Sequence, residues 1–162
     1  EHIVGELMKS FLFHRKLDSA LTQELTRLYG KDGEALIAQL EGGLPTIPLT
    51  SMPALSTAYA NDTSGTACFA QMTQSLGREG DVLLAISTSG NSQNILLAVM
   101  AANARHMTAI CLTGRSGGKC RGLADICICV PEDETFKIQE LHLPVYHALC
   151  AMAEASLFEE NH

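Results

Sequence analysis

Residues 80–106, GDVLLAISTSGNSQNILLAVMAANARH, join an apolar run, a cluster of hydroxyl side chains and a second apolar segment. The run 80–88 shows no polar alternation, which is typical of a strand buried on both faces. Residues 92–106 have the length and pattern of a helix. Two further strand-like runs follow at 108–114 and 125–131. Such strands separated by helices predict an α/β fold, a three-layer α/β/α sandwich around a parallel sheet.

Most of the remaining chain is predicted to be helical, because its apolar residues recur at helical spacing. Glycine pairs and prolines mark where these helices end. We expect helices at 2–13, 18–29, 33–41, 52–62, 66–76 and 136–158, a short helix at 119–124 and an extended run at 45–51. Pro144 falls inside the last and longest helix.

The 162 residues are enough for one domain with a sizeable core, so we expect a single domain over 1–162 with a helical insertion at about 14–44. A net charge of −7 argues against non-specific nucleic-acid binding. There is no apolar run of membrane-spanning length and no secretory signal. The helix that starts at Glu1 has no cap before it, so we expect this numbering to begin inside a longer protein.

The six cysteines do not suggest a disulfide framework or a cysteine zinc site. Cys111, Cys127, Cys129 and Cys150 lie in apolar runs, where cysteine usually behaves as a small buried hydrophobe. Cys127 and Cys129 form a C-x-C pair, and no second pair follows at zinc-ribbon spacing. Free cysteines of this kind indicate a cytoplasmic protein.

The segment 87–92, STSGNS, lies where ligands bind in parallel α/β folds, between the end of a strand and the start of a helix. Its hydroxyls and the free N–H groups of the helix can hold an anion. Gly90 allows the backbone to come close to a ligand. The segment is neither a Walker loop nor a G-x-G-x-x-G site. The alternative is a serine-rich helix cap, but one capping serine would serve that purpose, so we favour phosphate.

Five stretches of the sequence resemble the sugar isomerase (SIS) domain family, in particular its phosphoheptose isomerase type. AISTSGNSQNI resembles the signature loop of the family, HIVGE its H-x-x-x-E helix, and KIQELHLPVYH its C-terminal helix. YANDTSG resembles the Asn-Asp pair, and LTGRSGGKCRGLADICICVP the following strand–loop–strand. The resemblance implies a flavodoxin-like fold, usually a homotetramer. It also implies interconversion of sedoheptulose 7-phosphate and a heptose 7-phosphate aldose through an enediol, often with zinc.

The resemblance also implies roles for single residues. Glu6 and His147 would transfer protons. The remaining roles fall to residues that hold phosphate (Ser87, Thr88, Ser89 and Ser92), contact the sugar (Asn61, Asp62 and Gln139) or bind zinc (His2, Glu6, Gln139 and His147).

The residues themselves leave alternatives open. His2 and Glu6 are four residues apart and share a helix face, which suits a metal or acid–base site. From this spacing alone we would prefer a simple surface contact between them. Gln139 and His147 are separated by about 12 Å of helical rise. Their side chains can serve one site if Pro144 bends the helix or if they come from different subunits. His142 competes with His147, but we interpret it as a packed or surface histidine.

Two features depart from the family. The first strand and the N-G-G-S loop of the family have no counterpart after Glu1, so either they precede it or the site is incomplete. The segment 14–44 is longer than the usual connection, which suggests a structural or interface hairpin or a cover for the site. The main alternative to an isomerase is a non-catalytic member of the family, either a sugar-phosphate sensor or a replication-initiator-associating adaptor. Retention of His147 favours the enzyme.

Overall fold

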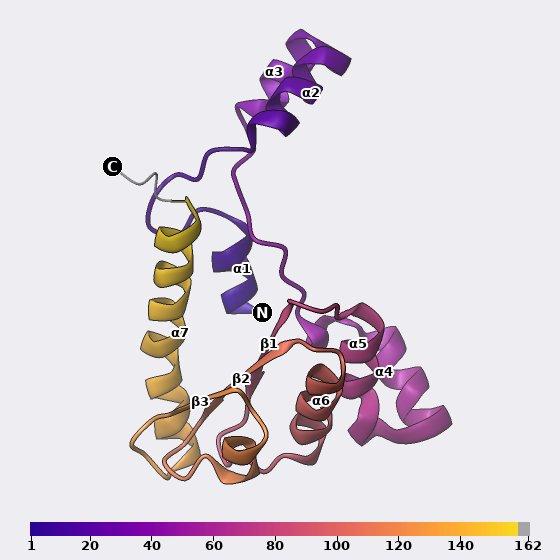
Figure 1. Cartoon of the computed structure of the whole chain (residues 1–162), viewed down its shortest axis with the longest axis vertical. Helices are drawn as coiled ribbons and strands as arrows, with labels where there is room; N and C mark the ends of the chain where they lie inside the picture. Colours follow the sequence, from indigo (N-terminus) through magenta and orange to yellow (C-terminus); the bar gives the residue numbers. More distant parts are fainter. Residues whose placement is uncertain (159–162) are drawn as a thin grey trace. The chain divides into compact units, whose positions relative to one another are not determined.

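The computed structural model describes residues 1–158, which form two compact units. The first unit comprises Glu1–Pro48 and the chain from Val145 onward, and the second comprises Leu49–Pro144. The last helix, α7 (Thr135–Phe158), therefore starts in the second unit and ends in the first (Figure 1). No helix between residues 1 and 158 is long and apolar enough to span a membrane.

The second unit contains the sheet, which has three parallel strands in the order β1-β2-β3. The strands are β1 (Val82–Ile86), β2 (Thr108–Thr113) and β3 (Ile126–Cys129). Ala85 pairs with Cys111, and Cys111 pairs with Cys127. The prediction of a parallel sheet is confirmed, although each strand is shorter than its apolar run.

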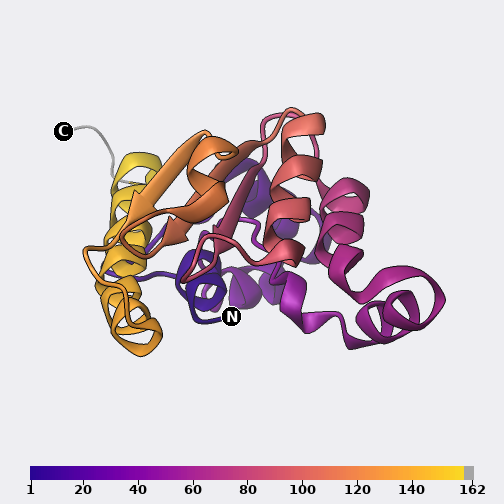
Figure 2. The same ribbon diagram turned by 90° about the horizontal axis from the view of Figure 1, so that it is seen from below.

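Helices cover both sides of this sheet, so the predicted α/β/α layering is confirmed. On one side, α6 (Gln93–Ala104) packs on β1 and β2, and α5 (Cys68–Leu76) packs on α6 (Figures 1 and 2). The first part of α7 lies on the other side, where the His142 imidazole is 3.2 Å from the Thr113 carbonyl oxygen. The core between α6 and the sheet consists of small and medium side chains: Ala85, Leu96, Val99, Ala102, Ala109, Cys111 and Cys120.

The segments before α5 are less regular than the sequence predicts. Residues 45–51 form no strand and end in the 3₁₀ helix η1 (Leu49–Ser51). The predicted helix 52–62 begins as α4 (Pro53–Tyr59) and then widens into the π-helix η2 (Ala60–Ser64). The 3₁₀ helix η3 (Gly65–Ala67) joins η2 to α5. The short helix expected at 119–124 is the 3₁₀ helix η4 (Gly118–Gly122).

In the first unit, α1 (His2–Met8) is shorter than the predicted helix 2–13. At Lys9 the backbone turns extended, with φ −132° and ψ 174°. The backbone N–H groups of Phe11 and Leu12 then donate to the Glu154 carboxylate, each at 2.7 Å, instead of to helical carbonyls. Hydrogen bonds to the Glu154 carboxylate, which is distant in the sequence, have therefore replaced those of the last turn of the predicted helix.

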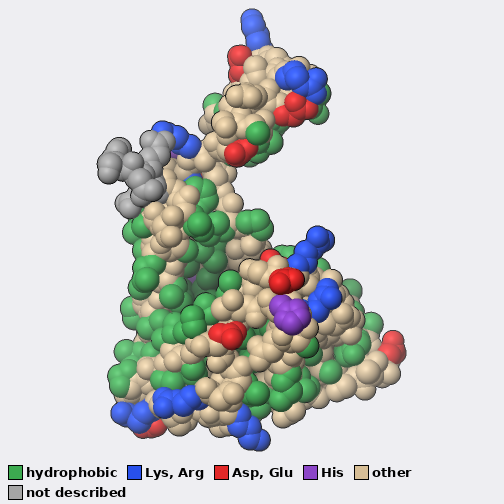
Figure 3. Space-filling model, in the orientation of Figure 1, with side chains coloured by type: hydrophobic (Ala, Val, Ile, Leu, Met, Phe, Trp, Pro, Cys, Tyr) green, Lys and Arg blue, Asp and Glu red, His purple; other side chains and the backbone are tan. Residues whose placement is uncertain are grey.

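A helical hairpin occupies most of the expected insertion. It consists of α2 (Ser19–Tyr29), capped by the Asp18 carboxylate, and α3 (Lys31–Ile37), which packs on α2. Lys, Arg, Asp and Glu side chains spread over its surface (Figure 3). Arg27 and Glu24 form an exposed ion pair there, at 2.6 Å. The prediction of two helices in this insertion is confirmed, with α3 displaced toward its N-terminal side.

Candidate active site

The hydroxyl-rich loop 87–92 joins β1 to α6 in the second unit. Ser87 is buried and its backbone N–H donates to the Leu112 carbonyl, so the strand pairing continues into the loop. The hydroxyls of Ser87 and Ser92 lie 3.0 Å apart. Ser92 is the N-cap of α6, but its side chain does not cap the helix. The first N–H groups of α6 and the exposed Ser89 and Ser92 side chains therefore suit an anion.

A second loop holds the turn of this first loop. Gly90 has a φ of +64°, and a Cβ there would collide with the Gly117 carbonyl oxygen. The Cys120 N–H donates to the Gly90 carbonyl at 3.0 Å, and the Lys119 N–H donates to Asn91 Oδ1 at 3.0 Å. The Asn91 amide in turn donates to the Ser89 carbonyl at 2.9 Å. The second loop, which contains η4, thus fixes the conformation of the first.

Asn61 and Asp62 lie in the π-helix η2, and both side chains are exposed. An open hollow of about 440 Å³ is lined by Thr57, Ala58, Ala60 and Asn61. Single π-helical turns within α-helices are frequent at functional sites, because they change the direction in which side chains project. This turn places Asn61, one of the two residues predicted to contact the sugar, at the hollow.

The first unit brings His2, Glu6 and His147 together with one residue that the sequence did not indicate, Tyr146. His2 Nε2 lies 3.3 Å from a Glu6 carboxylate oxygen, and His2 Nδ1 lies 2.9 Å from the Tyr146 hydroxyl. The rings of His2 and His147 meet edge to face, with centroids 5.1 Å apart. The Glu6 side chain is only 16% exposed, so its carboxylate is largely shielded, and Lys9 Nζ lies 3.2 Å from its other oxygen.

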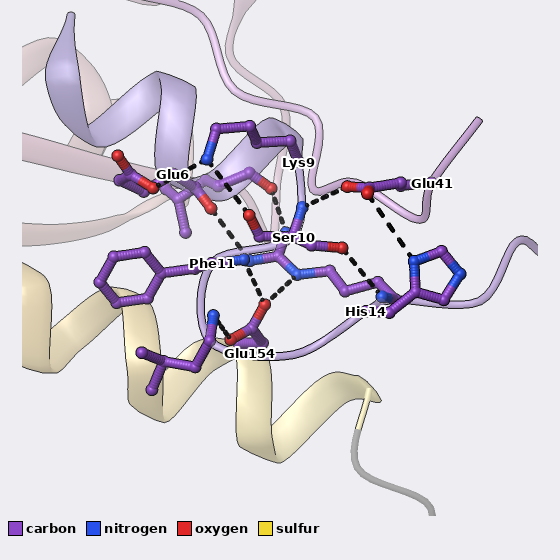
Figure 4. Close-up of polar contacts among 10 residues, drawn as sticks. Glu6, Lys9, Ser10, Phe11, His14, Glu41 and Glu154 are labelled. Carbon is purple, nitrogen blue, oxygen red and sulfur yellow. Dashed lines mark hydrogen bonds and ion pairs between the residues drawn. The ribbon is translucent and has the colours of Figure 1, made fainter. Parts of the chain in front are cut away.

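A buried ion pair holds the segment that follows α1, where the Glu154 carboxylate lies beside Phe11 (Figure 4). Arg15 and Glu154 are both fully buried, with Arg15 Nε 2.7 Å from Glu154 Oε1. The other Arg15 nitrogens donate to the Glu6 and Leu7 carbonyls at the end of α1. Burial would raise the pKa of Glu154, but its hydrogen bonds from Phe11, Leu12 and Arg15 outweigh burial and lower its pKa. The pair therefore ties α1 and the segment after it to the end of α7.

The predicted site residues are divided between the two units. Ser87, Thr88, Ser89 and Ser92 belong to the second unit, together with Asn61, Asp62 and the exposed Gln139. His2, Glu6 and the half-buried His147 belong to the first. His142 is buried in the second unit against β2. The roles of these residues stay predictions.

The His2 cluster does not form a metal centre in its present arrangement. Within residues 1–158, no group of three or more His, Cys, Asp and Glu side chains is arranged to hold a metal ion. Both ring nitrogens of His2 already contact a neighbour, Glu6 on one side and Tyr146 on the other. Imidazole and carboxylate are donors that zinc prefers, so only the chemical types of the ligands fit.

Sequence reasoning missed Tyr146, Asn91 and the Arg15–Glu154 pair. Tyr146 directly precedes His147, and neighbours in a helix do not share a face, so their spacing gave no sign that both would reach His2. Arg15 and Glu154 are 139 residues apart, so no local pattern connects them. Asn91 was visible within the hydroxyl-rich loop, but its role in linking two loops depends on the fold.

Comparisons with known proteins agree with this fold. The SIS domain family model matches residues 55–155. Phosphoheptose isomerase of Thiobacillus denitrificans is 50% identical over 121 residues, covering 71% of this chain and 60% of that protein. Phosphoheptose isomerase of Rhodospirillum rubrum is 41% identical over 133 residues, covering 78% of this chain and 71% of that protein.

The solved structure of phosphoheptose isomerase from Neisseria gonorrhoeae superimposes with a TM-score of 0.65 at 37% identity. That match covers 82% of this chain and 69% of the solved chain. The chain spans 60–62% of the length of the first three curated relatives that it matches. With the family model and these relatives in agreement, the chain belongs to the SIS domain family and, within it, to the phosphoheptose isomerases.

Proposed function

We propose that this chain acts as a phosphosugar aldose–ketose isomerase, interconverting sedoheptulose 7-phosphate and a heptose 7-phosphate aldose. The observation that carries the proposal is the shielded Glu6 carboxylate beside His2, with the His147 ring against His2. These groups offer a base and an acid within one compact unit. The relatives named phosphoheptose isomerase support the choice of substrate.

The reaction moves one proton between adjacent carbons and one between adjacent oxygens. Glu6 would take the proton from C2 of the aldose, while His147 donates a proton to the carbonyl oxygen at C1, which gives the enediol. Glu6 would then return its proton to C1, and His147 would accept the proton from the C2 hydroxyl. Both residues end as they began, so no other reactant is consumed. His2 lies beside both groups and would orient them.

The loop 87–92 would hold the phosphate of the substrate. Its hydroxyls and the N-terminus of α6 supply hydrogen-bond donors and the positive end of a helix dipole. Ser89 and Ser92 are exposed, so they can reach a ligand without displacing the core. Replacing both with alanine removes two charge-assisted hydrogen bonds, and we expect sugar phosphate to bind at least about tenfold more weakly.

Zinc binding is a separate proposal, on which no step above depends. The ligands would be His2, Glu6, Gln139 and His147, and the ion would polarise the oxygens of the sugar. Binding would require His2 to exchange one of its present contacts for the ion. Metal analysis of protein dialysed against zinc tests this: bound zinc that is lost in His2→Ala supports it, and no bound zinc contradicts it.

We further propose that the protein acts in the cytoplasm as a homo-oligomer, most simply a tetramer. Its six cysteines, all within the described residues, are free thiols, which suits a reducing compartment. The family resemblance supports the tetramer.

The function is tested by assaying wild type and Glu6→Gln with sedoheptulose 7-phosphate. The substitution keeps the size of the side chain but removes the base, so we expect turnover to fall at least about a hundredfold while phosphate binding persists. Deuterium at C2 of the aldose should exchange with solvent in wild type and not in Glu6→Gln. Glu24→Gln, on the exposed hairpin, is the matched control and should keep full turnover.

Two results would count against the proposal. If wild type shows neither turnover nor exchange while sugar phosphate still binds, a sensor or adaptor is favoured. If Glu6→Gln exchanges the label at the wild-type rate, the base is a different residue.

A further inference from the structure

Two cysteines on β3 lie side by side in the second unit. Cys127 and Cys129 are two residues apart on one strand, so both side chains project from the same face of the sheet. Their sulfur atoms are 3.7 Å apart, and both are half-buried. This distance is that of a hydrogen bond between two free thiols, which are not joined by a disulfide.

The surroundings of Cys129 favour its thiolate. The Thr113 hydroxyl donates to Cys129 Sγ at 3.4 Å, and the Arg121 guanidinium donates to it at 3.3 Å. Burial would raise the pKa of Cys129, but the hydrogen bonds from Thr113, Arg121 and Cys127 outweigh burial and lower its pKa. Cys129 is therefore a stronger candidate nucleophile than an ordinary thiol at neutral pH.

The other cysteines are protected by comparison. Burial raises the pKa of Cys127, and the neighbouring Cys129 raises it further. Burial also raises the pKa of Cys111 to about 12, and it raises the pKa of Cys150. Cys68 and Cys120 are almost inaccessible, with exposures of 6% and 0%. One activated thiol with one protonated thiol beside it is the arrangement of an attacking and a resolving cysteine.

We propose that Cys129 is a site of reversible oxidation by hydroperoxides, with Cys127 as the thiol that resolves the oxidised form. The pair, the guanidinium of Arg121 and the hydroxyl of Thr113 together make up this site. It lies in the second unit and is independent of the isomerase chemistry proposed for Glu6 and His147.

The reaction balances in two steps. The Cys129 thiolate attacks the terminal oxygen of a hydroperoxide, so an S–O bond forms, the O–O bond breaks and the alkoxide leaves as an alcohol after protonation. The sulfenic acid so formed is two electrons more oxidised than the thiol. Cys127 sulfur then attacks Cys129 sulfur, the S–S bond forms, and the hydroxyl leaves as water with the Cys127 proton. The sum is two thiols and a hydroperoxide giving a disulfide, an alcohol and water.

Closing the disulfide would disturb the end of β3. The sulfurs must move about 1.7 Å closer, from 3.7 Å to the ~2.05 Å of a disulfide bond. Residues i and i+2 of an extended strand have Cα atoms about 6.7 Å apart, near the upper limit for a disulfide, so the strand must contract locally. Formation of the disulfide would also remove the Cys129 thiolate that Arg121 contacts.

This change would reach the anion-binding loop through η4. Arg121 belongs to η4, and Cys120 and Lys119 of the same element donate to Gly90 and Asn91. If oxidation loosens η4, the hydrogen bonds to Gly90 and Asn91 weaken. The loop 87–92 is then held less firmly in its anion-binding conformation. The expected consequence is weaker anion binding by oxidised protein, a step that depends on the proposed phosphate site, whereas the oxidation itself does not.

The test begins with the full chain, fully reduced. Limited iodoacetamide at neutral pH, followed by peptide mass spectrometry, should label Cys129 at least about tenfold faster than any of the other five cysteines. Treatment with one equivalent of hydrogen peroxide should remove two hydrogen atoms from the mass, located to the Cys127–Cys129 peptide, and dithiothreitol should restore them.

Variants separate the two thiols. Cys127→Ser should leave Cys129 as a sulfenic acid that dimedone traps, whereas Cys129→Ser should form no intramolecular disulfide. Arg121→Gln should slow labelling of Cys129 severalfold. The matched control is Arg105→Gln, another exposed arginine of this unit, which donates to the Gly77 carbonyl and should leave the labelling rate unchanged.

Each result decides the proposal without reference to enzyme activity. Equal labelling of Cys129 and the other cysteines in wild type would overturn it, as would peroxide treatment that leaves the Cys127–Cys129 peptide reduced. Both measurements use the wild-type protein, so they do not depend on whether a variant folds. Binding of inorganic phosphate to reduced and oxidised protein, measured by calorimetry, tests only the link to the loop. A confirmed disulfide with unchanged phosphate binding would leave the oxidation site and remove that link.

Discussion

His2 contacts a carboxylate through one ring nitrogen and a phenol through the other. Glu6 lies at Nε2 and the Tyr146 hydroxyl at Nδ1. The two partners together fix the plane of the ring and the nitrogen that faces the carboxylate. We therefore expect Tyr146 to act as a positioning residue for Glu6, the proposed base, through its contact with His2.

Tyr146→Phe tests this role, because it removes the hydroxyl and keeps the ring. His2 then loses one of its two fixed contacts, and we expect turnover to fall about fivefold to tenfold with an unchanged KM for sugar phosphate. Tyr29→Phe, at an exposed position on the hairpin, is the control and should change neither constant. A rise in KM with constant turnover would show that Tyr146 binds substrate instead.

The buried Arg15–Glu154 pair gives a second prediction at this scale. Glu154→Ala leaves the buried Arg15 charge without its partner, so we expect a loss of about 3 kcal/mol or more in the free energy of unfolding by urea. Replacing both residues with apolar side chains, Arg15→Met and Glu154→Leu, should cost less than Glu154→Ala alone. A double variant that is less stable than Glu154→Ala would contradict this prediction.

The same pair sets a pH dependence. Because the pKa of Glu154 is lower in the folded protein than its ordinary value of 4.5, ionised Glu154 stabilises the fold above that value. This contribution is lost as the pH falls through the lower, native pKa. The free energy of unfolding should therefore fall more steeply below about pH 4.5 in wild type than in Glu154→Gln. If the free energies of unfolding of wild type and Glu154→Gln fell equally steeply at acid pH, this prediction would be contradicted.

Among the elements, the segment from β1 through the loop 87–92 to α6 was the most predictable. An apolar run without alternation, a cluster of hydroxyls and a helical pattern are all local signals, so the order strand, loop and helix is visible in adjacent residues. The end of α1 was not predictable, because the apolar residues 11 and 12 continue the helical pattern. Their backbone N–H groups donate hydrogen bonds instead to the carboxylate of Glu154, which is more than 140 residues away in the chain.

Gly90→Ala tests how the two loops hold each other. An added Cβ would need a left-handed φ and would collide with the Gly117 carbonyl, so the loop must move. We expect a loss of stability above the roughly 1–2 kcal/mol of left-handed strain alone and about tenfold weaker phosphate binding. Gly80→Ala, at φ +88° with open space around it, isolates the strain and should leave phosphate binding intact. Equal effects of the two substitutions would contradict the close approach.

At the scale of the whole molecule, the sequence predicted the fold class, because strands without polar alternation that are separated by helices indicate a parallel sheet covered on both faces. It did not predict how the site residues would be divided. His2, Glu6 and His147 fall in one compact unit, and the loop 87–92 falls in the other. A sequence pattern gives the residue types at each position, whereas their division into compact units depends on contacts between distant segments.

The oligomeric state belongs to this largest scale. Large apolar side chains of the first unit are exposed, among them Leu12 at 68%, Met152 at 67% and Leu157 at 62%. Covering such side chains gains about 25 cal/mol for each Å² removed from water, so we expect copies of the chain to associate through them. Light scattering at micromolar concentration should give the mass of a homo-oligomer, most simply a tetramer.

Met152→Glu should lower that mass, because a charge would replace an apolar contact in the expected interface. Met100→Glu is the matched control, since Met100 is 47% exposed on α6 in the other unit and the substitution is the same. It should leave the mass unchanged. A monomeric wild type would contradict the prediction outright. A mass that falls only with Met100→Glu would move the interface from the end of α7 to α6.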